Sequence, residues 1–126
     1  MAKLDLSDAY RHILVRPQDW PLLGFTWPMF VDGSLHMGYF FDVFLPFGSR
    51  SAPALFLRYA DALAFLMADR GTSIVWHYLD DSFTCGPASP STQCQRNLDI
   101  IVSSCQLLNF TLYQDKLVHP TTCLTL

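Results

Sequence analysis

The feature that most constrains the fold is a pair of adjacent carboxylates between two apolar runs. Residues 74–78 lead into Asp80 and Asp81, and residues 82–85 lead away to Gly86. β-Branched and aromatic residues around a short polar turn predict a β-hairpin with the two acids at its tip. Because neighbouring carboxylates repel one another, a divalent cation would explain their placement. The alternative is that both acids merely serve the turn and are solvated.

Composition restricts the class of protein further. The chain has 126 residues, enough for one domain or for a piece of a larger one. It is 51% hydrophobic and only 15% charged, which predicts a large core or apolar surface that something else covers. No apolar run approaches the ~18 residues of a membrane span, and residues 1–5 lack the apolar region of a signal peptide. We therefore expect an intracellular protein, in the cytoplasm or the nucleus, that is neither secreted nor bound to a membrane.

Charge and cysteine usage argue against two further classes. The net charge of −3 does not indicate a basic surface, so the chain by itself is not expected to bind nucleic acid strongly. No cysteine belongs to a C-x-x-C pair, and no histidine stands at zinc spacing from one. In a reducing compartment we expect buried free thiols. These are Cys85, Cys94, Cys105 and Cys123.

A second hairpin is predicted upstream of the acids. Two aromatic-rich runs, residues 22–27 and 36–44, flank Asp32-Gly33, a strong hairpin signal. We expect a somewhat long tip there, and bulges or close backbone approaches at Gly24 and Gly38. The aromatic side chains are expected to lie in a core or an interface rather than to stack on bases.

Two long amphipathic stretches predict helices. The first spans residues 52–70 and ends before Gly71, and its many small and apolar residues indicate that most of its circumference is covered. The second spans residues 91–108. Short extended pieces are expected at residues 3–6, 13–15, 110–113 and 117–119. This order of hairpins and helices predicts an α+β fold in which an antiparallel sheet is backed by two helices.

Asp5 is a candidate third acid. It follows an apolar strand start, so a sheet can aim it at the same point as the Asp80 hairpin. Three carboxylates on adjacent strands suit a two-metal phosphoryl-transfer site, in which the cations lie ~3.5–4 Å apart. Mg²⁺ needs few protein ligands, because waters and substrate phosphates complete its shell. The alternative is that Asp5 simply caps the turn that follows it.

Four stretches resemble, in order, the motifs of the reverse transcriptase palm. Residues 3–10 resemble the first motif, 45–56 the second, the Y-x-D-D box at 78–81 the third, and 108–116 the fourth. One such box is a weak signal, but four ordered motifs over nearly the whole chain are a strong one. The resemblance implies a polymerase palm-like sheet backed by two helices. It would occupy residues 1–126 as a partial domain, incomplete at both ends, without fingers or thumb.

The resemblance also implies a set of catalytic and metal-binding residues. Asp5 and Asp80 would bind two Mg²⁺ ions, which Mn²⁺ can replace, with Asp81 as a nearby and less direct acid. The backbone carbonyl of Leu6 would complete one metal's shell. Lys116 would protonate the departing pyrophosphate. The alternative for Lys116 is a solvated loop lysine.

A second set of residues is implied to bind the incoming nucleotide. Tyr10 would lie under the sugar and exclude a 2′-hydroxyl, while Phe47 and Gly48 would line the nucleotide pocket. Backbone amides near Asp8 and Ala9 would meet the triphosphate. Two alternatives remain: Tyr10 is an ordinary buried aromatic, and Asp8 caps its own turn.

The function implied by the resemblance is that of an RNA-directed DNA polymerase, a nucleotidyltransferase that adds deoxynucleotides to a primer 3′-hydroxyl. Its partners would be a primed RNA or DNA template, deoxynucleoside triphosphates, and the fingers, thumb and RNase H portions of a larger polyprotein. Phe47 in the second motif and the form of the third are most similar to retrotransposon enzymes. Among these, the DIRS-like class, which encodes a tyrosine recombinase, fits best. We expect the isolated chain to have little or no activity.

Two other interpretations stay open. The first is a non-catalytic remnant of a retroelement polymerase that acts as a folded interaction domain. The intact Asp5, Asp80 and Asp81 favour descent from a working enzyme, because a remnant can lose such acids without harming its core. The second is another two-carboxylate nuclease or phosphotransferase. Tyr10 and the loop at Phe47 argue against it, because a nuclease needs neither.

Overall fold

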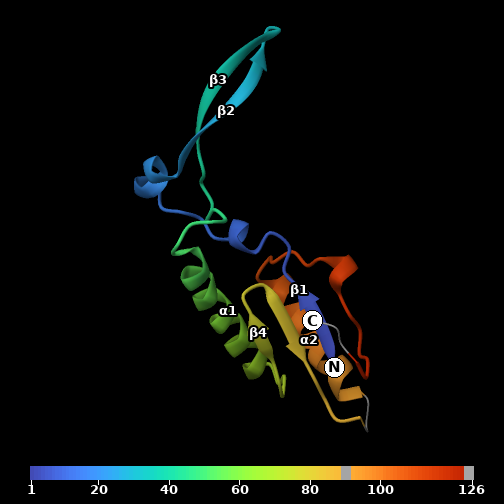
Figure 1. Cartoon of the computed structure of the whole chain (residues 1–126). Coiled ribbons are helices and arrows are strands. Elements are labelled where there is room, and N and C mark those ends of the chain that lie inside the picture. The colour runs from blue at the N-terminus through green and yellow to red at the C-terminus, as the bar shows by residue number, and fades with distance from the viewer. Residues whose placement is uncertain (89–91, 124–126) are drawn as a thin grey trace. The chain divides into compact units, whose positions relative to one another are not determined.

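The computed structural model describes residues 1–88 and 92–123, and these form an α+β fold with antiparallel sheets, as predicted (Figure 1). The strands are β1 (Ala2–Asp5), β2 (Gly24–Val31), β3 (Ser34–Phe41), β4 (Trp76–Tyr78) and β5 (Asp81–Thr84). The α-helices are α1 (Ala52–Asp69) and α2 (Thr92–Leu107), and short 3-10 helices span Ala9–His12, Pro17–Leu23 and Gln114–Lys116. The predicted start of the second helix at Ser91 lies outside the described residues.

The chain divides into two compact units. The sheet unit comprises residues 1–9 and 53–126, and the hairpin unit comprises residues 10–52. Each unit has its own antiparallel pairing: β1, β5 and β4 belong to the first, and β2 and β3 to the second. The two units are therefore described in turn.

The sheet unit is built on a three-stranded antiparallel sheet in the order β1-β5-β4. The edge of β1 that does not pair with β5 forms single bridges to the C-terminal segment, from Lys3 to Val118 and from Leu6 to Leu112. These bridges confirm the extended pieces predicted around Gln114–Lys116. β1 is therefore held from both sides.

Side-chain alternation gives this sheet two different faces. Ala2 lies opposite Thr84 and Leu4 opposite Ser82, and all four of these residues are buried. They form the core face, which α2 covers through its contacts with β1 and β5. The intervening positions, Lys3, Asp5, Asp81 and Phe83, form the opposite face, which we call the acid face.

A buried amide ties α2 to the end of β5. The Asn97 side chain is fully buried and donates to the Thr84 hydroxyl over 3.0 Å and to the Cys85 carbonyl over 3.1 Å. Its own carbonyl oxygen accepts a hydrogen bond from Gln93. A buried polar group is tolerated only when it is paired in this way, so Asn97 fixes where β5 lies under the helix.

Replacing Asn97 with alanine is expected to lower the free energy of unfolding by about 1–3 kcal/mol, because it leaves buried polar partners unpaired. Urea denaturation followed by circular dichroism measures the loss. The matched control is Gln95→Ala on the same helix, whose side chain hydrogen bonds in an exposed pair with Asp99. Equal losses in the two variants would contradict the structural role of Asn97.

Helix α1 is covered less than predicted. One stripe is buried, and it consists of Ala52, Phe56, Ala60, Leu63 and Met67. Large apolar side chains elsewhere on the helix are exposed, namely Leu55, Leu57, Tyr59 and Phe65. The expectation that most of the circumference is covered is therefore wrong. The expectation rested on the apolar composition of the helix, but a single contacting surface covers only one stripe of a helix. The helix ends as predicted, with Gly71 in the left-handed region at φ +95°.

The hairpin unit carries the predicted upstream hairpin, with two corrections. β2 and β3 pair without interruption from Gly24 opposite Phe41 to Val31 opposite Ser34, so there is no bulge at Gly24 or Gly38. The tip is also not long. Asp32 and Gly33 alone form it, with φ +50° and +78°, which are the two positive angles of a type I′ turn. Gly38 instead makes room for side chains, since a Cβ there would lie 2.8 Å from the Met29 sulfur.

The aromatic residues of this hairpin are not in a core. Phe25, Trp27, Phe40 and Phe41 are all exposed, and Phe25 stacks on Phe40 with ring centroids 5.7 Å apart. A two-stranded ribbon has no second layer to cover its faces, so the core half of the expectation is wrong, while the interface half stays a prediction. Hydropathy could not show this, because it does not reveal how many strands join a sheet.

The cysteines are free, as predicted, but they are not all buried. Cys94 and Cys105 are buried, Cys85 is half-buried, and Cys123 is exposed, which corrects the expectation for the last two. Burial raises the pKa of the Cys105 thiol to about 12, so this thiol is unreactive at neutral pH. Among the described residues, no helix is long and apolar enough to cross a membrane.

Candidate active site

The two adjacent acids lie where the sequence predicts them, at the tip of the β4–β5 hairpin. Tyr78 pairs with Asp81, which leaves Leu79 and Asp80 as a two-residue turn. Leu79 has φ +53°, in the left-handed region that the first central residue of such a turn requires. This conformation costs a residue with a branched side chain about 1 kcal/mol. The surrounding structure must therefore hold the turn in place.

Asp5 stands beside this hairpin. It is directly opposite Asp81 in the β1–β5 pairing, and the next residue, Leu6, donates its N–H to the Asp80 carbonyl over 3.1 Å. The sheet therefore brings the backbones of all three predicted acids together at one end. Asp5 is only 3% exposed, whereas the Asp81 side chain is 43% exposed. The burial of Asp5 is the most unusual feature of the group, because a carboxylate is rarely buried without a partner.

Lys116 is that partner. Its Nζ donates to Asp5 Oδ2, while Asp5 Oδ1 is buried and has no hydrogen-bond partner in the part of the chain that the structure describes. The hydrogen bond to Asp5 raises the pKa of Lys116 above its ordinary value, because it stabilises the charged ammonium group. The ammonium also lies 4.6 Å from the centroid of the Tyr113 ring, within reach of a cation–π contact. Lys116 thus has specific contacts although its side chain is 60% exposed, so both the predicted role and the solvated-loop alternative remain.

The C-terminal segment explains how Lys116 reaches Asp5 across the chain. Tyr113 donates its N–H to the Asp5 carbonyl over 3.0 Å, and the short 3-10 helix Gln114–Lys116 begins at the next residue. After that helix, Val118 and Lys3 exchange a pair of backbone hydrogen bonds. The helix is therefore a protrusion between two points fixed to β1, and Lys116 is its last residue.

Sequence reasoning missed one member of the group, Lys3. Its Nζ lies 3.1 Å from Asp81 Oδ1, and its side chain is only 19% exposed. Lys3 and Asp5 are two residues apart on a strand and so share a face, which is the signal that could have found it. Asp81 is on the same face of the neighbouring strand, diagonal to Lys3.

The acids suit a hard divalent cation in their chemistry. Carboxylate and carbonyl oxygens are the ligands that Mg²⁺ prefers, and the unpartnered Asp5 Oδ1 is an acceptor with no donor. However, no group of three or more His, Cys, Asp or Glu side chains in residues 1–88 and 92–123 is arranged to hold a metal ion. Two of the three acids instead face lysines. The metal site therefore stays a prediction, with Asp5, Leu6, Asp80 and Asp81 as its residues.

The predicted nucleotide-binding residues fall in both units. Asp8 and Ala9 follow β1 in the sheet unit. Asp8 has φ +51° and its carboxylate accepts a hydrogen bond from the Ser7 hydroxyl, as expected of an acid that serves its own turn. Ala9 is buried and begins a 3-10 helix.

Tyr10, Phe47 and Gly48 lie in the hairpin unit. The edge of one ring of the Tyr10–Phe47 pair meets the face of the other, with centroids 4.7 Å apart and planes at 75°. Tyr10 is buried and Phe47 is exposed, so both the predicted position and the alternative of an ordinary buried aromatic remain for Tyr10. Gly48 has φ +87°, an angle that favours glycine.

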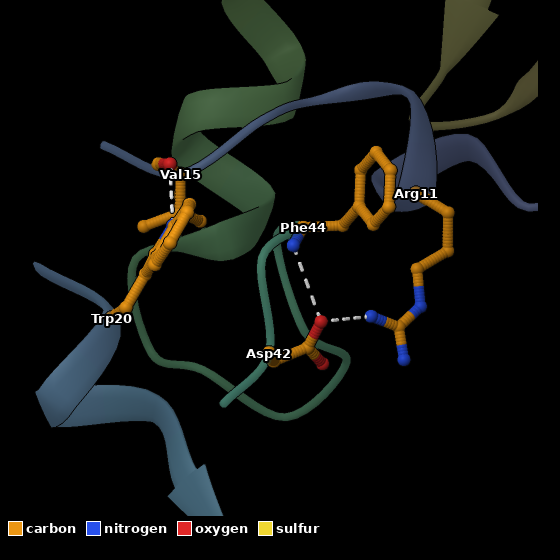
Figure 2. Close-up of polar contacts among 5 residues, drawn as sticks. All are labelled: Arg11, Val15, Trp20, Asp42 and Phe44. Carbon is orange, nitrogen blue, oxygen red and sulfur yellow. Dashed lines mark hydrogen bonds and ion pairs between the residues drawn. The ribbon is translucent and has the colours of Figure 1, made fainter. Parts of the chain in front are cut away.

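Backbone hydrogen bonds within the hairpin unit connect the segment after Tyr10 to the segment before Phe47. Val15 donates its N–H to the Val43 carbonyl, and Leu45 donates to the Ile13 carbonyl, each over 2.9 Å. Figure 2 shows the side chains around this pairing: Asp42 accepts from Arg11 and from the Phe44 N–H, and Trp20 donates to the Val15 carbonyl. The extended piece predicted at residues 13–15 is confirmed by this pairing.

The chain is similar to a known protein family. The family model for the reverse transcriptase (RNA-dependent DNA polymerase) matches residues 1–123. A search of curated proteins finds no similar sequence. The match spans both units, and so includes the acids, both lysines and the Tyr10–Phe47 pair.

Proposed function

The chain belongs to the reverse transcriptase family, and we propose that it is the palm domain, which carries the acids of a two-metal nucleotidyl-transfer site. The reaction would add a deoxynucleotide to the 3′-hydroxyl of a primer paired with an RNA or DNA template. The observation that carries this proposal is the buried Asp5 carboxylate beside the Asp80 turn, with one oxygen unpartnered. Folding alone gives no reason to bury such a group.

Asp5 and Asp80 would hold two Mg²⁺ ions, with the Leu6 carbonyl as a further ligand and Asp81 as an outer acid. When bound, the ions would lower the pKa of the primer hydroxyl and neutralise charge on the phosphates. The chain's own contribution is positioning. β1, β5 and the two-residue turn fix the three acids at one end of the sheet before any substrate arrives.

Lys116 would supply the proton for the leaving group. Its ammonium is charged at neutral pH even at the ordinary pKa of lysine, and the hydrogen bond to Asp5 raises that pKa further. A protonated amine within the acid group suits a general acid for departing pyrophosphate, provided that it can leave Asp5. Its exposed position on a short 3-10 helix is compatible with that movement.

Three residues of the hairpin unit would select the nucleotide. We propose that the Tyr10 ring lies under the sugar and is held there by its edge contact with Phe47. The exposed ring of Phe47 and the open backbone at Gly48 would line the pocket. Backbone amides near Asp8 and Ala9 would meet the triphosphate.

Other parts of a larger polyprotein would complete the enzyme. The exposed apolar side chains of α1, β2 and β3 are surface that fingers, thumb or RNase H portions would cover. The form of the second and third motifs supports a retrotransposon source, of the DIRS-like class. We therefore propose that the isolated chain has little or no polymerase activity.

Primer extension and cation binding together test the proposed function. The isolated chain is assayed on a primed RNA template with Mg²⁺, with and without an added fingers segment, and Mn²⁺ binding is measured by calorimetry. We expect Mn²⁺ to bind, and extension to be absent or weak without the added segment. Absence of binding would overturn the metal site, and processive synthesis by the chain alone would overturn its proposed dependence on other portions.

A further inference from the structure

The sequence contains two lysines, and both contact acids of the candidate site. Lys116 Nζ donates to Asp5 Oδ2, and Lys3 Nζ lies 3.1 Å from Asp81 Oδ1. We propose that these lysines are internal counter-ions with different roles: a divalent cation displaces Lys116 from Asp5, whereas Lys3 holds Asp81 throughout. This inference rests on the proposed metal site and assigns to Lys3 a positioning role.

Lys116 can exchange because its side chain is 60% exposed and its backbone belongs to a three-residue 3-10 helix. Leaving Asp5 returns its ammonium to water, which costs little for an exposed group. Asp5 cannot follow it, because the carboxylate is buried on a strand that is paired on both edges. A cation that approaches Asp5 therefore competes with Lys116 for the same carboxylate, whose Oδ1 has no hydrogen-bond donor among the described residues.

Lys3 is held more firmly. Its N–H and carbonyl both bond to Val118, over 3.1 and 2.8 Å, and it lies opposite Phe83 on the other edge of β1. Its side chain is 19% exposed, so the ammonium has little room to leave Asp81. While it stays, Lys3 neutralises the Asp81 charge and reduces repulsion on the acid face. Asp81 is thereby kept from acting as a full ligand, although it is next to Asp80.

Selective labelling distinguishes the two roles in the unaltered chain. With ¹³C-labelled lysine, the NMR spectrum contains two ε-methylene signals, which Lys3→Met and Lys116→Met assign. MgCl₂ is then titrated at constant ionic strength. We expect the Lys116 signal to move and saturate at the Mg²⁺ concentration where calorimetry shows binding, while the Lys3 signal stays in place.

Cation affinity gives a second measurement. Lys116→Met removes the competitor and is expected to tighten Mn²⁺ binding about tenfold, a change of about 1.4 kcal/mol. Lys3→Met frees Asp81 and is also expected to tighten binding several-fold, whereas Lys3→Arg, which keeps the pairing, should restore the original affinity. The matched control is Arg58→Met, which removes the same charge from an exposed site on α1 and should leave affinity within about twofold.

The outcomes separate this inference from the proposed function. If calorimetry shows Mg²⁺ binding but both lysine signals move together, or neither moves, the separate roles are wrong while the metal site stands. Looser binding in Lys116→Met also contradicts the exchange. If neither calorimetry nor NMR detects Mg²⁺, the metal site itself fails, and the inference fails with it.

Discussion

Replacing Asp5 with asparagine is expected to abolish the stabilisation of the chain by divalent cations. A ligand that binds only the folded state stabilises it by about 2.7 kcal/mol when present at a hundred times its dissociation constant. The asparagine side chain would keep the shape of the buried carboxylate but would have no charge to hold the cation. The measurement is the thermal midpoint of unfolding with and without Mn²⁺, and we expect the difference to vanish in Asp5→Asn.

Two comparisons make this result specific. Without cations, Asp5→Asn should unfold close to the unaltered chain, because the exposed Lys116 can return to water when its partner is lost. The matched control is Asp69→Asn, which removes the same charge at the exposed end of α1. It should keep the full Mn²⁺ effect. An Asp5→Asn variant that Mn²⁺ still stabilises would show that the cation binds elsewhere.

The largest loss of stability is expected from Phe56→Ala. Phe56 is 1% exposed and belongs to the single buried stripe of α1. Removing a buried phenylalanine loses apolar transfer free energy and leaves a cavity, which together cost about 3–5 kcal/mol. This is a large fraction of the roughly 5–15 kcal/mol that holds a domain folded. The midpoint of urea denaturation should therefore fall sharply.

The same helix supplies the control for this substitution. Phe65 has the same side chain but is 77% exposed, so Phe65→Ala should change the free energy of unfolding by less than about 0.5 kcal/mol. The pair removes identical atoms from one helix and differs only in burial. If both variants lose the same stability, the buried stripe of α1 has been assigned to the wrong side.

Local patterns predicted the elements of this fold well. Asp32-Gly33 and the run into Asp80 each marked a hairpin, and Gly71 marked the end of α1. These signals work because a turn or a helix end depends on the residues beside it. The position of Asp5 next to the Asp80 hairpin was also expected, because an acid after an apolar strand start can be aimed by a sheet at a neighbouring strand.

What the sequence could not supply was the pairing of residues far apart in the chain. Lys116 reaches Asp5 only because the C-terminal segment bridges to β1, and no local pattern encodes that bridge. The sequence also did not show which apolar side chains are covered by other parts of the chain. Phe40 and Phe65 are large and apolar, as core residues usually are, but each is exposed in its own unit. Hydropathy states what a side chain prefers and does not state whether a partner surface is available.

The division of the sheet into a core face and an acid face links correct folding to correct chemistry. Side chains alternate along a strand, so a slip of one residue in β1 would exchange its two faces. Lys3 and Asp5 would then point toward α2, and Leu4 would point away from it. Such a register would separate both charges from their partners, place them against the apolar core and leave Leu4 uncovered, so it would not form a stable sheet. Mutations that disturb the register should therefore yield unfolded chains, seldom well-folded ones with misplaced acids. Selection for a stable sheet alone would preserve the geometry of the acids.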